Sequence, residues 1–359
     1  MPDLNNLESI KNIFKNQLFD AIIISAPINI KWASGFNGSN GWLFITSKEQ
    51  SLMTDSRYET QANIQCPDWE IQIGERHGIK NILNKINRDS SKKIAILEDE
   101  FLLKDYFEIK ENINNDKELI IISHQNNPIT TLRMTKNSNE VQFIEQSAIL
   151  ASEVMNYGIS NITEKITEKK LANLIEIYAR EQGADSMSFN TIVASGERSA
   201  MPHAIPSNQS ILKNNITLID LGVYLNEYAS DITRTFWNGN KNKQYASYYN
   251  IVLLAQNIAS ERAEVGMNAR DIHQIAETVF SEAGVSDLFI HGLGHGVGME
   301  VHEKPYIDKN SEDKLCANAI ITIEPGIYIR GWGGIRIEDM YQVTDTGLKQ
   351  LTTANKHLI

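Results

Sequence analysis

The stretch Ile216-Thr-Leu-Ile-Asp220-Leu-Gly222 has the composition of a buried β-strand, except that a carboxylate interrupts its apolar run. An unpaired carboxylate inside a protein is costly, so Asp220 must be protonated, paired with a cation or bound to a metal. A second acid, Asp231, follows in the next expected strand, and Asn226 and Glu227 between the two suit a tight turn. The segment therefore predicts a hairpin that brings the two carboxylates together.

The same interruption occurs twice more toward the C-terminus. Ile320-Ile-Thr-Ile-Glu324-Pro-Gly326 ends an apolar strand on a carboxylate, and the Pro-Gly pair that follows forces the chain to turn. In Ile335-Arg-Ile-Glu338-Asp339, we expect Glu338 near the middle of a strand. Arg336 should share its face, because side chains alternate along a strand. Both segments therefore repeat the pattern of an acid in an apolar strand.

Together these four acids carry more negative charge than their neighbours can neutralise. One such acid alone is commonly explained by a salt bridge or a turn cap. The cations on the same segments are Arg234, Arg330 and Arg336, which are too few for four carboxylates. Two divalent cations would balance them, and such a pair, roughly 3.5–4 Å apart, lowers the pKa of a shared water. Hydrolysis is the chemistry that this arrangement favours.

A histidine-rich segment supplies a nitrogen ligand. His291-Gly-Leu-Gly-His295-Gly-Val-Gly-Met-Glu-Val-His302 holds three of the eight histidines, among glycines that let backbone and ligands approach closely. The spacing is neither that of a zinc finger nor HExxH, and no GK[ST] supports a nucleotide loop. The alternative to a metal-binding segment is a flexible glycine loop in which histidines occur by chance. Four carboxylates and one imidazole suit Mn²⁺, Co²⁺, Fe²⁺ or Zn²⁺, and hardly Cu⁺.

The N-terminal third predicts an α/β domain, because short apolar runs alternate with amphipathic stretches. The expected strands are 21–25, 42–46, 51–54, 69–73, 93–97 and 119–123, and the expected helices are 4–15, 57–65, 79–87 and 100–110. A polar seam at residues 124–139, which contains Pro128, separates the two domains that we expect at residues 1–127 and 131–359.

The C-terminal part predicts a duplicated ααββ unit. Asn137 and Glu140 form a capping box ahead of a helix with an apolar face. The expected order is this helix, a helix at 167–183, strands at 189–194, 216–223 and 228–236, helices at 243–265 and 269–283, and strands at 320–323, 326–329 and 335–343. Two helices, strands, two helices and strands thus follow one another, and the domain is α+β.

Composition narrows the function classes. The chain has 359 residues, 42% of them hydrophobic and 22% charged, as in a globular protein of two domains. A net charge of −11 without a dense Lys/Arg run argues against a nucleic-acid partner. Cys66 and Cys316 form no CxxC pair, which fits a reducing compartment. With no signal peptide and no apolar run long enough for a bilayer, we expect a cytoplasmic protein without a membrane partner.

These motifs resemble the pita-bread metallopeptidases, in the branch of Xaa-Pro aminopeptidase (aminopeptidase P) and Xaa-Pro dipeptidase (prolidase). The likeness covers about residues 131–351 and rests on the order and spacing of all five candidate ligands. Weaker motifs, Ala33-Ser-Gly-Phe-Asn-Gly-Ser39 and Met53-Thr-Asp-Ser-Arg-Tyr58, resemble the creatinase/prolidase N-terminal domain. The resemblance implies a pita-bread catalytic domain behind a creatinase-like one.

The resemblance also implies a set of metal ligands, Asp220, Asp231, His295, Glu324 and Glu338. They would hold two divalent ions, Mn²⁺ first, with Co²⁺, Zn²⁺ or Fe²⁺ as alternatives. Asp231 and Glu338 would bridge the ions. Glu324 would bind one ion and help to deprotonate the nucleophilic water.

Three further histidines and one arginine are assigned by the same resemblance. His203, in Met201-Pro-His-Ala204, would bind the substrate, and His291 and His302 would steady the substrate and the tetrahedral intermediate. Arg336 would lie beside the ligands and the substrate.

The implied activity is hydrolysis of the bond before proline at the N-terminus of short peptides, by a metal-bridging hydroxide. The His-Gly-Leu-Gly-His form favours the aminopeptidase, and the dipeptidase is the alternative. A non-catalytic binding module on this fold is the remote alternative, and such proteins typically lose ligands. Relatives are usually homodimers, so a homodimer is expected. The loop at 32–42 would reach a partner's cleft or be an ordinary exposed loop.

Overall fold

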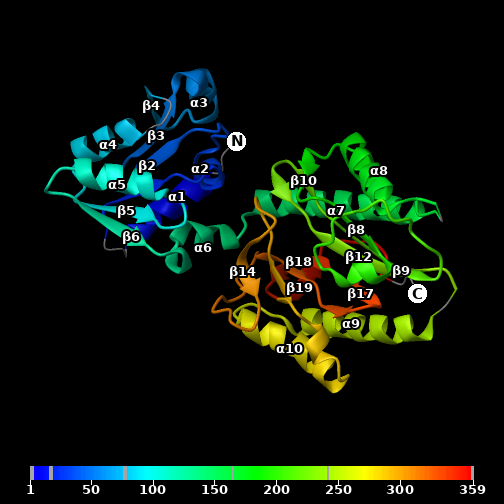
Figure 1. Cartoon of the computed structure of the whole chain (residues 1–359). Helices are drawn as coiled ribbons and strands as arrows, with labels where there is room; N and C mark the ends of the chain where they lie inside the picture. The colour runs from blue at the N-terminus through cyan, green and yellow to red at the C-terminus, as the bar shows by residue number, and fades with distance from the viewer. Residues whose placement is uncertain (1–3, 16–18, 76–78, 164, 241, 357–359) are drawn as a thin grey trace. The chain divides into compact units, whose positions relative to one another are not determined.

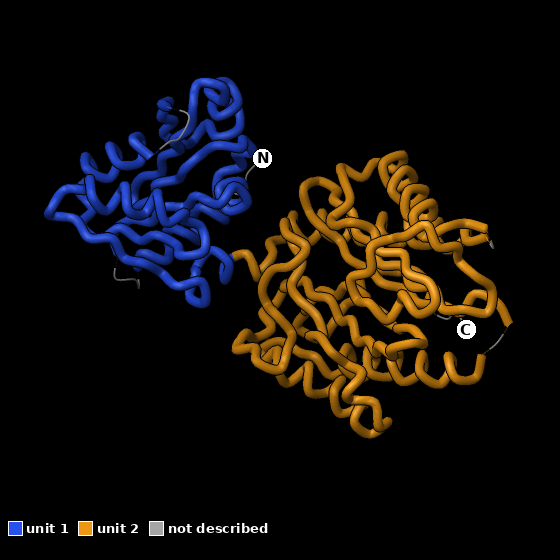
Figure 2. The backbone as a smooth tube through the Cα atoms, in the orientation of Figure 1, with its two compact units in different colours: residues 1–132 blue, residues 133–359 orange. Residues whose placement is uncertain are grey.

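The computed structural model describes residues 4–15, 19–75, 79–163, 165–240 and 242–356, and it divides the chain into two compact units. Unit 1 comprises residues 1–132 and unit 2 residues 133–359 (Figure 2). The expected polar seam contains a short helix, α6 (Pro128–Met134), which we did not predict. Proline is well suited to the first turn of a helix, because the N–H that it lacks would have no partner there.

Unit 1 is built on one mixed six-stranded sheet with the order β4-β3-β2-β1-β5-β6. Its strands are β1 (Ala21–Ile24), β2 (Trp42–Thr46), β3 (Gln50–Asp55), β4 (Glu70–Gly74), β5 (Lys93–Leu97) and β6 (Glu118–Ile122). Its helices are α1 (Leu4–Ile13), α2 (Pro27–Ser34), α3 (Glu59–Gln65), α4 (Ile79–Arg88) and α5 (Leu103–Asn112). All six expected strands are present, which confirms the α/β class of this unit.

Helix α2 was not expected, and it changes the role of Glu100. The prediction placed Glu100 at the start of a helix, but α5 begins only at Leu103. The Glu100 carboxylate instead accepts hydrogen bonds from the backbone N–H groups of Ser25 and Ala26, at 2.7 and 2.8 Å, where α2 begins. A carboxylate there satisfies donors that have no partner within the helix.

Unit 2 contains two pairs of helices, each followed by strands, which confirms the predicted duplication. The first half is α7 (Ser138–Ser160), α8 (Glu168–Glu181), β7 (Ser186–Met187), β8 (Ile192–Ser195), β9 (Asn215–Leu221), β10 (Val223–Leu225), β11 (Tyr228–Ala229) and β12 (Ile232–Asn238). The second half is α9 (Lys243–Arg262), α10 (Ala269–Glu282), β13 (Gly294–Gly296), β14 (Glu303–Ile307), β15 (Ile320–Ile323), β16 (Gly326–Ile329), β17 (Gly333–Arg336), β18 (Asp339–Thr344) and β19 (Gly347–Gln350).

The strands of unit 2 lie between the two helix pairs, with α7 and α8 on one side and α9 and α10 on the other (Figure 1). Apolar side chains of α7 and α8 pack with those of β9 and β12 in one core cluster. Those of α9 and α10 pack with β15 and the strands that follow it in another. The capping box of Asn137 and Glu140 at the start of α7 is confirmed. No helix in the described ranges is long and apolar enough to cross a bilayer.

Two predicted strands are each divided in the structure. The segment 228–236 forms β11 in one sheet and β12 in another, and Asp231 lies in the gap between them. The segment 335–343 forms β17 and β18, again in different sheets, and Glu338 lies in that gap rather than in mid-strand. Alternating apolar residues cannot reveal such a change of sheet, because both pieces keep the pattern of a strand.

Candidate active site

The five candidate ligands come from five segments of unit 2 that the sheets bring together. Asp220 lies in β9, and Asp231 lies in the gap between β11 and β12. His295 is the central residue of β13, Glu324 directly follows β15, and Glu338 lies between β17 and β18. The predicted hairpin pairs β9 with β12 in antiparallel register, with Asp220 opposite Thr233.

The ligand atoms of these side chains form three overlapping groups, and within each group they all lie within 4.8 Å of one another. Asp220, Asp231 and Glu338 make one group, and His295, Glu324 and Glu338 make another. The third contains Asp231, His295 and His302. Glu338, Asp231 and His295 each belong to two groups, so they lie at the centre of the cluster.

Glycines allow His295 to enter the cluster from a tightly packed strand. A Cβ atom at Gly294 would collide with the carbonyl oxygen of Thr322, and one at Gly296 with that of Lys304. Strand β13 runs between β14 and β15, so the close approach of its neighbours requires glycine on both sides of His295. The His295 N–H donates to Thr322 Oγ1 at 3.1 Å.

The carboxylates of the cluster are electrostatically crowded. Burial, and then the neighbouring carboxylates, raise the pKa of Asp231 and of Glu338 well above their ordinary values. Burial alone would also raise the pKa of Glu324, but the hydrogen bond and charge of His295 lower it to about 2. His295 Nε2 lies 3.3 Å from Glu324 Oε1, and this pairing raises the pKa of the imidazole against the effect of its burial.

The cluster offers oxygen atoms that no protein group in the described ranges satisfies. Asp220 Oδ1 and Glu338 Oε1 are buried and have no hydrogen-bond partner there. Of the three arginines considered from the sequence, only Arg336 contacts a candidate ligand side chain, donating from Nη2 to Asp220 Oδ2 at 2.6 Å. Arg330 is exposed, and Arg234 pairs with Asp339. Buried carboxylate oxygens without partners, beside an imidazole, fit divalent cations.

Thr233 and Tyr328 were missed by the sequence analysis. Thr233 Oγ1 donates to Glu338 Oε2 at 2.7 Å and accepts from Arg336 Nε at 3.0 Å, so it orients a candidate ligand. Arg336 Nη1 donates to the hydroxyl of Tyr328 at 2.8 Å. Arg336 is buried, and its contact with the substrate stays a prediction. Thr233 follows Asp231 at the two-residue spacing of one strand face, a signal that could have identified it.

His291 is held as a neutral imidazole. Its Nδ1 lies 2.7 Å from the carbonyl oxygen of Gly292, which only accepts, so Nδ1 carries the hydrogen. Burial lowers the pKa of His291. In the neutral ring Nε2 has a free lone pair, so it accepts from the Tyr328 hydroxyl at 2.9 Å.

The other two histidines lie on the exposed side of the cluster. The ring of His302 is 4.2 Å from that of His295, and burial, together with the charge of His295, lowers the pKa of His302 to about 4. His203 is exposed in the loop after Met201. After burial and other nearby charges, His203 also lowers the pKa of both His291 and His302. The charge of His203 thus acts on both of the other histidines.

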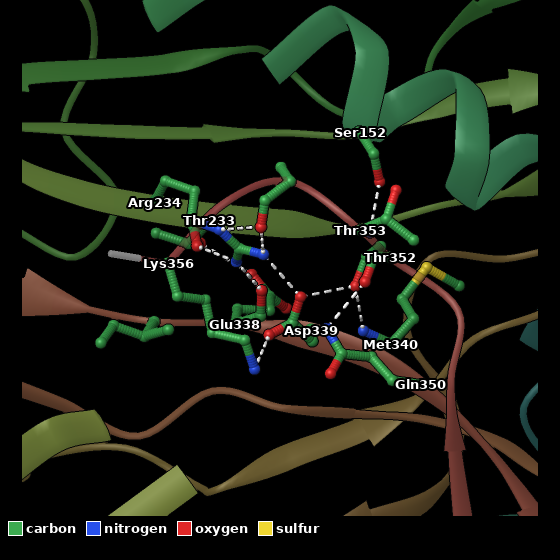
Figure 3. Close-up of polar contacts among 12 residues, drawn as sticks. Ser152, Thr233, Arg234, Glu338, Asp339, Met340, Gln350, Thr352, Thr353 and Lys356 are labelled. Carbon is green, nitrogen blue, oxygen red and sulfur yellow. Dashed lines mark hydrogen bonds and ion pairs between the residues drawn. The ribbon is translucent and has the colours of Figure 1, made fainter. Parts of the chain in front are cut away.

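A buried polar network supports the gap that carries Glu338 (Figure 3). Arg234, a fully buried side chain, donates from Nη1 to the Glu338 carbonyl oxygen at 2.6 Å and from Nη2 to Asp339 Oδ1 at 2.7 Å. Thr352 donates to the same Asp339 oxygen, and Lys356 lies 2.8 Å from Asp339 Oδ2. The residues after β19 thereby fix the start of β18.

Comparisons with known proteins identify the two units. Residues 142–345 match the profile described as "Metallopeptidase family M24", and residues 6–135 match the "Creatinase/Prolidase N-terminal domain". Both matches confirm the resemblance inferred from the motifs.

Individual relatives agree with this result. The chain is 33% identical over 357 residues to the Xaa-Pro dipeptidase of Pyrococcus furiosus, covering 98% of this chain and 99% of the relative. The structure of an Xaa-Pro dipeptidase from Bacillus anthracis has a TM-score of 0.94 at 32% identity, covering 99% of both chains. An X-Pro aminopeptidase from Thermotoga maritima has a TM-score of 0.86 at 32% identity, covering 94% of this chain and 96% of its own.

The expected fold class, an α/β domain ahead of a pita-bread domain, is thus confirmed. The chain belongs to metallopeptidase family M24, a family of hydrolases that use divalent metals, and within it to the proline-specific Xaa-Pro dipeptidases and aminopeptidases.

Proposed function

We propose that this chain is an Xaa-Pro dipeptidase that uses two divalent ions held by Asp220, Asp231, His295, Glu324 and Glu338. The observation that carries the metal part of this proposal is the buried group of carboxylates with two unpartnered oxygens. The dipeptidase part is supported by the relatives and solved structures with that name, at 32–33% identity over nearly the whole chain. These relatives favour the dipeptidase, which was the alternative in the sequence analysis, over the aminopeptidase that the histidine segment suggested.

The overlapping groups support a specific division of labour among the ligands. Asp231 and Glu338 are carboxylates that each belong to two groups, and the two oxygens of a carboxylate allow it to bridge two ions. His295 also belongs to two groups, but its Nδ1 faces the Gly296 carbonyl oxygen at 3.1 Å, which leaves one nitrogen for an ion. Asp220 belongs to one group with both of these carboxylates, and Glu324 belongs to one group with His295 and Glu338. We propose Mn²⁺ as the resident ion, with Co²⁺, Fe²⁺ and Zn²⁺ as the other ions that this donor set accepts.

Two such ions, when bound, lower the pKa of a water molecule and polarise the carbonyl that it attacks. The chain supplies the remaining functions. In the metal-free chain Glu324 is ionised at neutral pH, since its pKa is lowered to about 2, so its carboxylate is available to bind an ion. Its part in taking the proton of the attacking water rests on the family resemblance. His203 and His302, on the exposed side, contact the peptide, and the hydrogen bond from Tyr328 holds the neutral His291 beside it.

Acceptance of proline follows from the chemistry of the bond. An Xaa-Pro bond is a tertiary amide without an N–H, so an enzyme that needs that hydrogen binds it poorly. In the proposed mechanism the side chains act on the carbonyl, and none of them requires the missing N–H. Preference for proline would come from packing against its apolar ring, for which the three imidazoles offer flat surfaces.

The deciding experiment compares Leu-Pro with Leu-Pro-Gly-Gly as substrates of the Mn²⁺-loaded protein. We expect turnover of the dipeptide and little cleavage of the tetrapeptide, because a dipeptidase recognises the terminal carboxylate next to the scissile bond. Cleavage of the tetrapeptide with little turnover of the dipeptide would establish the aminopeptidase. This activity is the second candidate because the X-Pro aminopeptidase of Thermotoga maritima is a similar structure. Hydrolysis of neither, with no bound metal by elemental analysis, would refute both.

We also propose that the active form is a homodimer, as the family resemblance implied. Sedimentation equilibrium of the metal-loaded chain should give twice the mass of one chain. A monomer with full dipeptidase activity would contradict this proposal.

A further inference from the structure

The loop at residues 201–207, which carries His203, has little apolar packing to hold it. Met201, His203 and Ile205 are exposed, with 82% of Ile205 accessible. Ala204 is the one buried residue in the loop. Keeping such a segment in one conformation costs backbone entropy that packing of a single alanine side chain does not offset. Polar contacts must therefore supply the restraint.

A fully buried carboxylate provides that restraint. Glu168, the first residue of α8, accepts hydrogen bonds from both the N–H and the Oγ of Ser207, at 2.9 and 2.7 Å. It also accepts from the Ser195 N–H at 2.8 Å and from Arg198 Nε at 2.9 Å. One side chain thus joins the end of the loop to the segment that follows β8, and its buried charge is satisfied by these donors.

Arg198 extends the connection into the loop. While its Nε bonds to Glu168, its Nη2 donates to the carbonyl oxygen of Ile205. On the other side of His203, Arg336 Nη1 lies 3.4 Å from the carbonyl oxygen of Pro202. The loop is therefore bound on both sides of His203, and one of the two attachments comes from the candidate active site itself.

Capping of α8 does not account for Glu168. The N-cap of this helix is Thr167, whose side chain accepts from the Lys170 N–H. The Glu168 carboxylate bonds instead to residues 195, 198 and 207, which lie in other segments. An acid needed only for the helix dipole would have no reason to be completely buried.

We propose that Glu168 and Arg198 are positioning residues that hold the loop at residues 201–207 so that His203 meets the substrate. This inference rests on the proposed function, because it requires a peptide that His203 contacts. It assigns to α8, a helix remote from the candidate ligands in sequence, a part in substrate binding.

The first test uses Arg198→Lys, with Arg180→Lys on the exposed face of α8 as the matched control. Lysine keeps a positive partner for Glu168, but its single ammonium cannot reproduce the two-sided contact of arginine. We expect the melting temperature and the bound Mn²⁺ to stay at the parent level. Because a small misplacement of a binding group is costly, kcat/KM for Leu-Pro should fall roughly tenfold, mainly through KM. An unchanged kcat/KM would overturn the proposal.

The second test asks whether Arg198 acts through His203. In a double-mutant cycle with His203→Ala, the effect of Arg198→Lys on kcat/KM should largely disappear, because the group that it positions is absent. Full additivity of the two losses would overturn the proposal. Glu168→Gln, with the exposed Glu181→Gln as control, should give the same result if it folds.

A third measurement needs no activity. Amide hydrogen exchange across residues 201–207 should be faster in Arg198→Lys than in the parent and in Arg180→Lys. If the parent hydrolyses no Xaa-Pro peptide, the proposed function fails, while exchange still shows whether Arg198 restrains the loop. Exchange equal to that of the parent would overturn the restraint itself.

Discussion

Asp231 lies in a concentration of negative charge that costs free energy whenever no cation compensates it. Its carboxylate is buried beside Glu338, Asp220 and Glu324, which together with burial raise its pKa. A buried carboxylate that stabilises the fold only when a cation is bound is typical of a binding site and not of a structural core. At the scale of the residue, the carboxylates of Asp231 and Glu338 thus oppose folding of the metal-free chain, whereas Glu324 is paired with His295.

Replacing Asp231 with Asn should therefore separate stability from activity. Without metal at neutral pH, Asp231→Asn should melt at or above the temperature of the parent, because repulsion among the carboxylates is relieved. With Mn²⁺, the parent should gain more stability than the variant, and the variant should lose activity. Calorimetry with and without Mn²⁺ measures both effects, and Asp287→Asn, at an exposed position, is the control. A metal-free variant clearly less stable than the parent would contradict this account.

Thr233 offers a test of how a ligand is oriented. Thr233→Val keeps the shape but removes the hydroxyl that donates to Glu338 and accepts from Arg336. Because partners of ligands orient them, Mn²⁺ affinity or activity should fall about 10–100-fold, as measured by titration calorimetry.

Thr217 is the matched control for that substitution. It is fully buried on the adjacent strand β9, and its hydroxyl has no partner in the described ranges. Thr217→Val should leave affinity unchanged and stability equal or slightly higher, since an unsatisfied hydroxyl is removed. Equal losses of affinity in both variants would show that Thr233 acts through packing alone.

At the scale of the element, the gap between β17 and β18 is fixed by the network around Asp339. Arg234 comes from β12, Gln256 from α9, and Thr352 and Lys356 follow β19, and all contact the Asp339 carboxylate. The gap lies outside both sheets, so this network and the hydrogen bond from the Glu338 N–H to the Thr233 carbonyl oxygen hold Glu338 in place.

Asp339→Ala should be strongly destabilising. It leaves Arg234 buried without its carboxylate partner, and breaking a buried pair from one side costs about 3–5 kcal/mol. Urea unfolding of the metal-free protein measures the loss, with Asp345→Ala at an exposed position as the control. A loss no larger than that of the control would show that the network does not stabilise the gap.

At the scale of the whole molecule, each unit has its own apolar core. The cluster around β1, β2 and α4 lies within unit 1, and the clusters around α7 to α10 lie within unit 2. All five candidate ligands belong to unit 2. Binding of an ion should therefore act on the stability of one unit and not of the other.

Removal of metal should accordingly affect one of two thermal transitions. Addition of Mn²⁺ to chelator-treated protein should raise the melting temperature of unit 2, because each bound ion adds about 2.7 kcal/mol to its free energy of unfolding at a hundredfold excess over Kd. The transition of unit 1 should stay in place. Differential scanning calorimetry measures this, and the shifted transition is assigned by its smaller response in Asp231→Asn. Equal shifts of both transitions, or none, would contradict independent units.

Much of the fold was predictable because local patterns of apolar and polar residues indicate many of its strands and helices. Strands β2, β5, β15 and β16 begin and end at the predicted residues, since each is a short apolar run with clear flanking breaks. Helix α2 was missed although Pro27 stands in its first turn, where proline is favoured. The divided strands were missed because both pieces of a divided strand keep a strand's pattern.

The sequence alone indicated the family and the five candidate ligands, because a carboxylate in an apolar strand and a histidine among glycines are visible without a structure. The roles of these ligands stay predictions. The groups that hold those ligands and the loop at residues 201–207 became visible only in the tertiary structure. Thr233, Asp339 and Glu168 act on partners far away in the chain, and contacts made by folding leave no pattern in the neighbouring sequence.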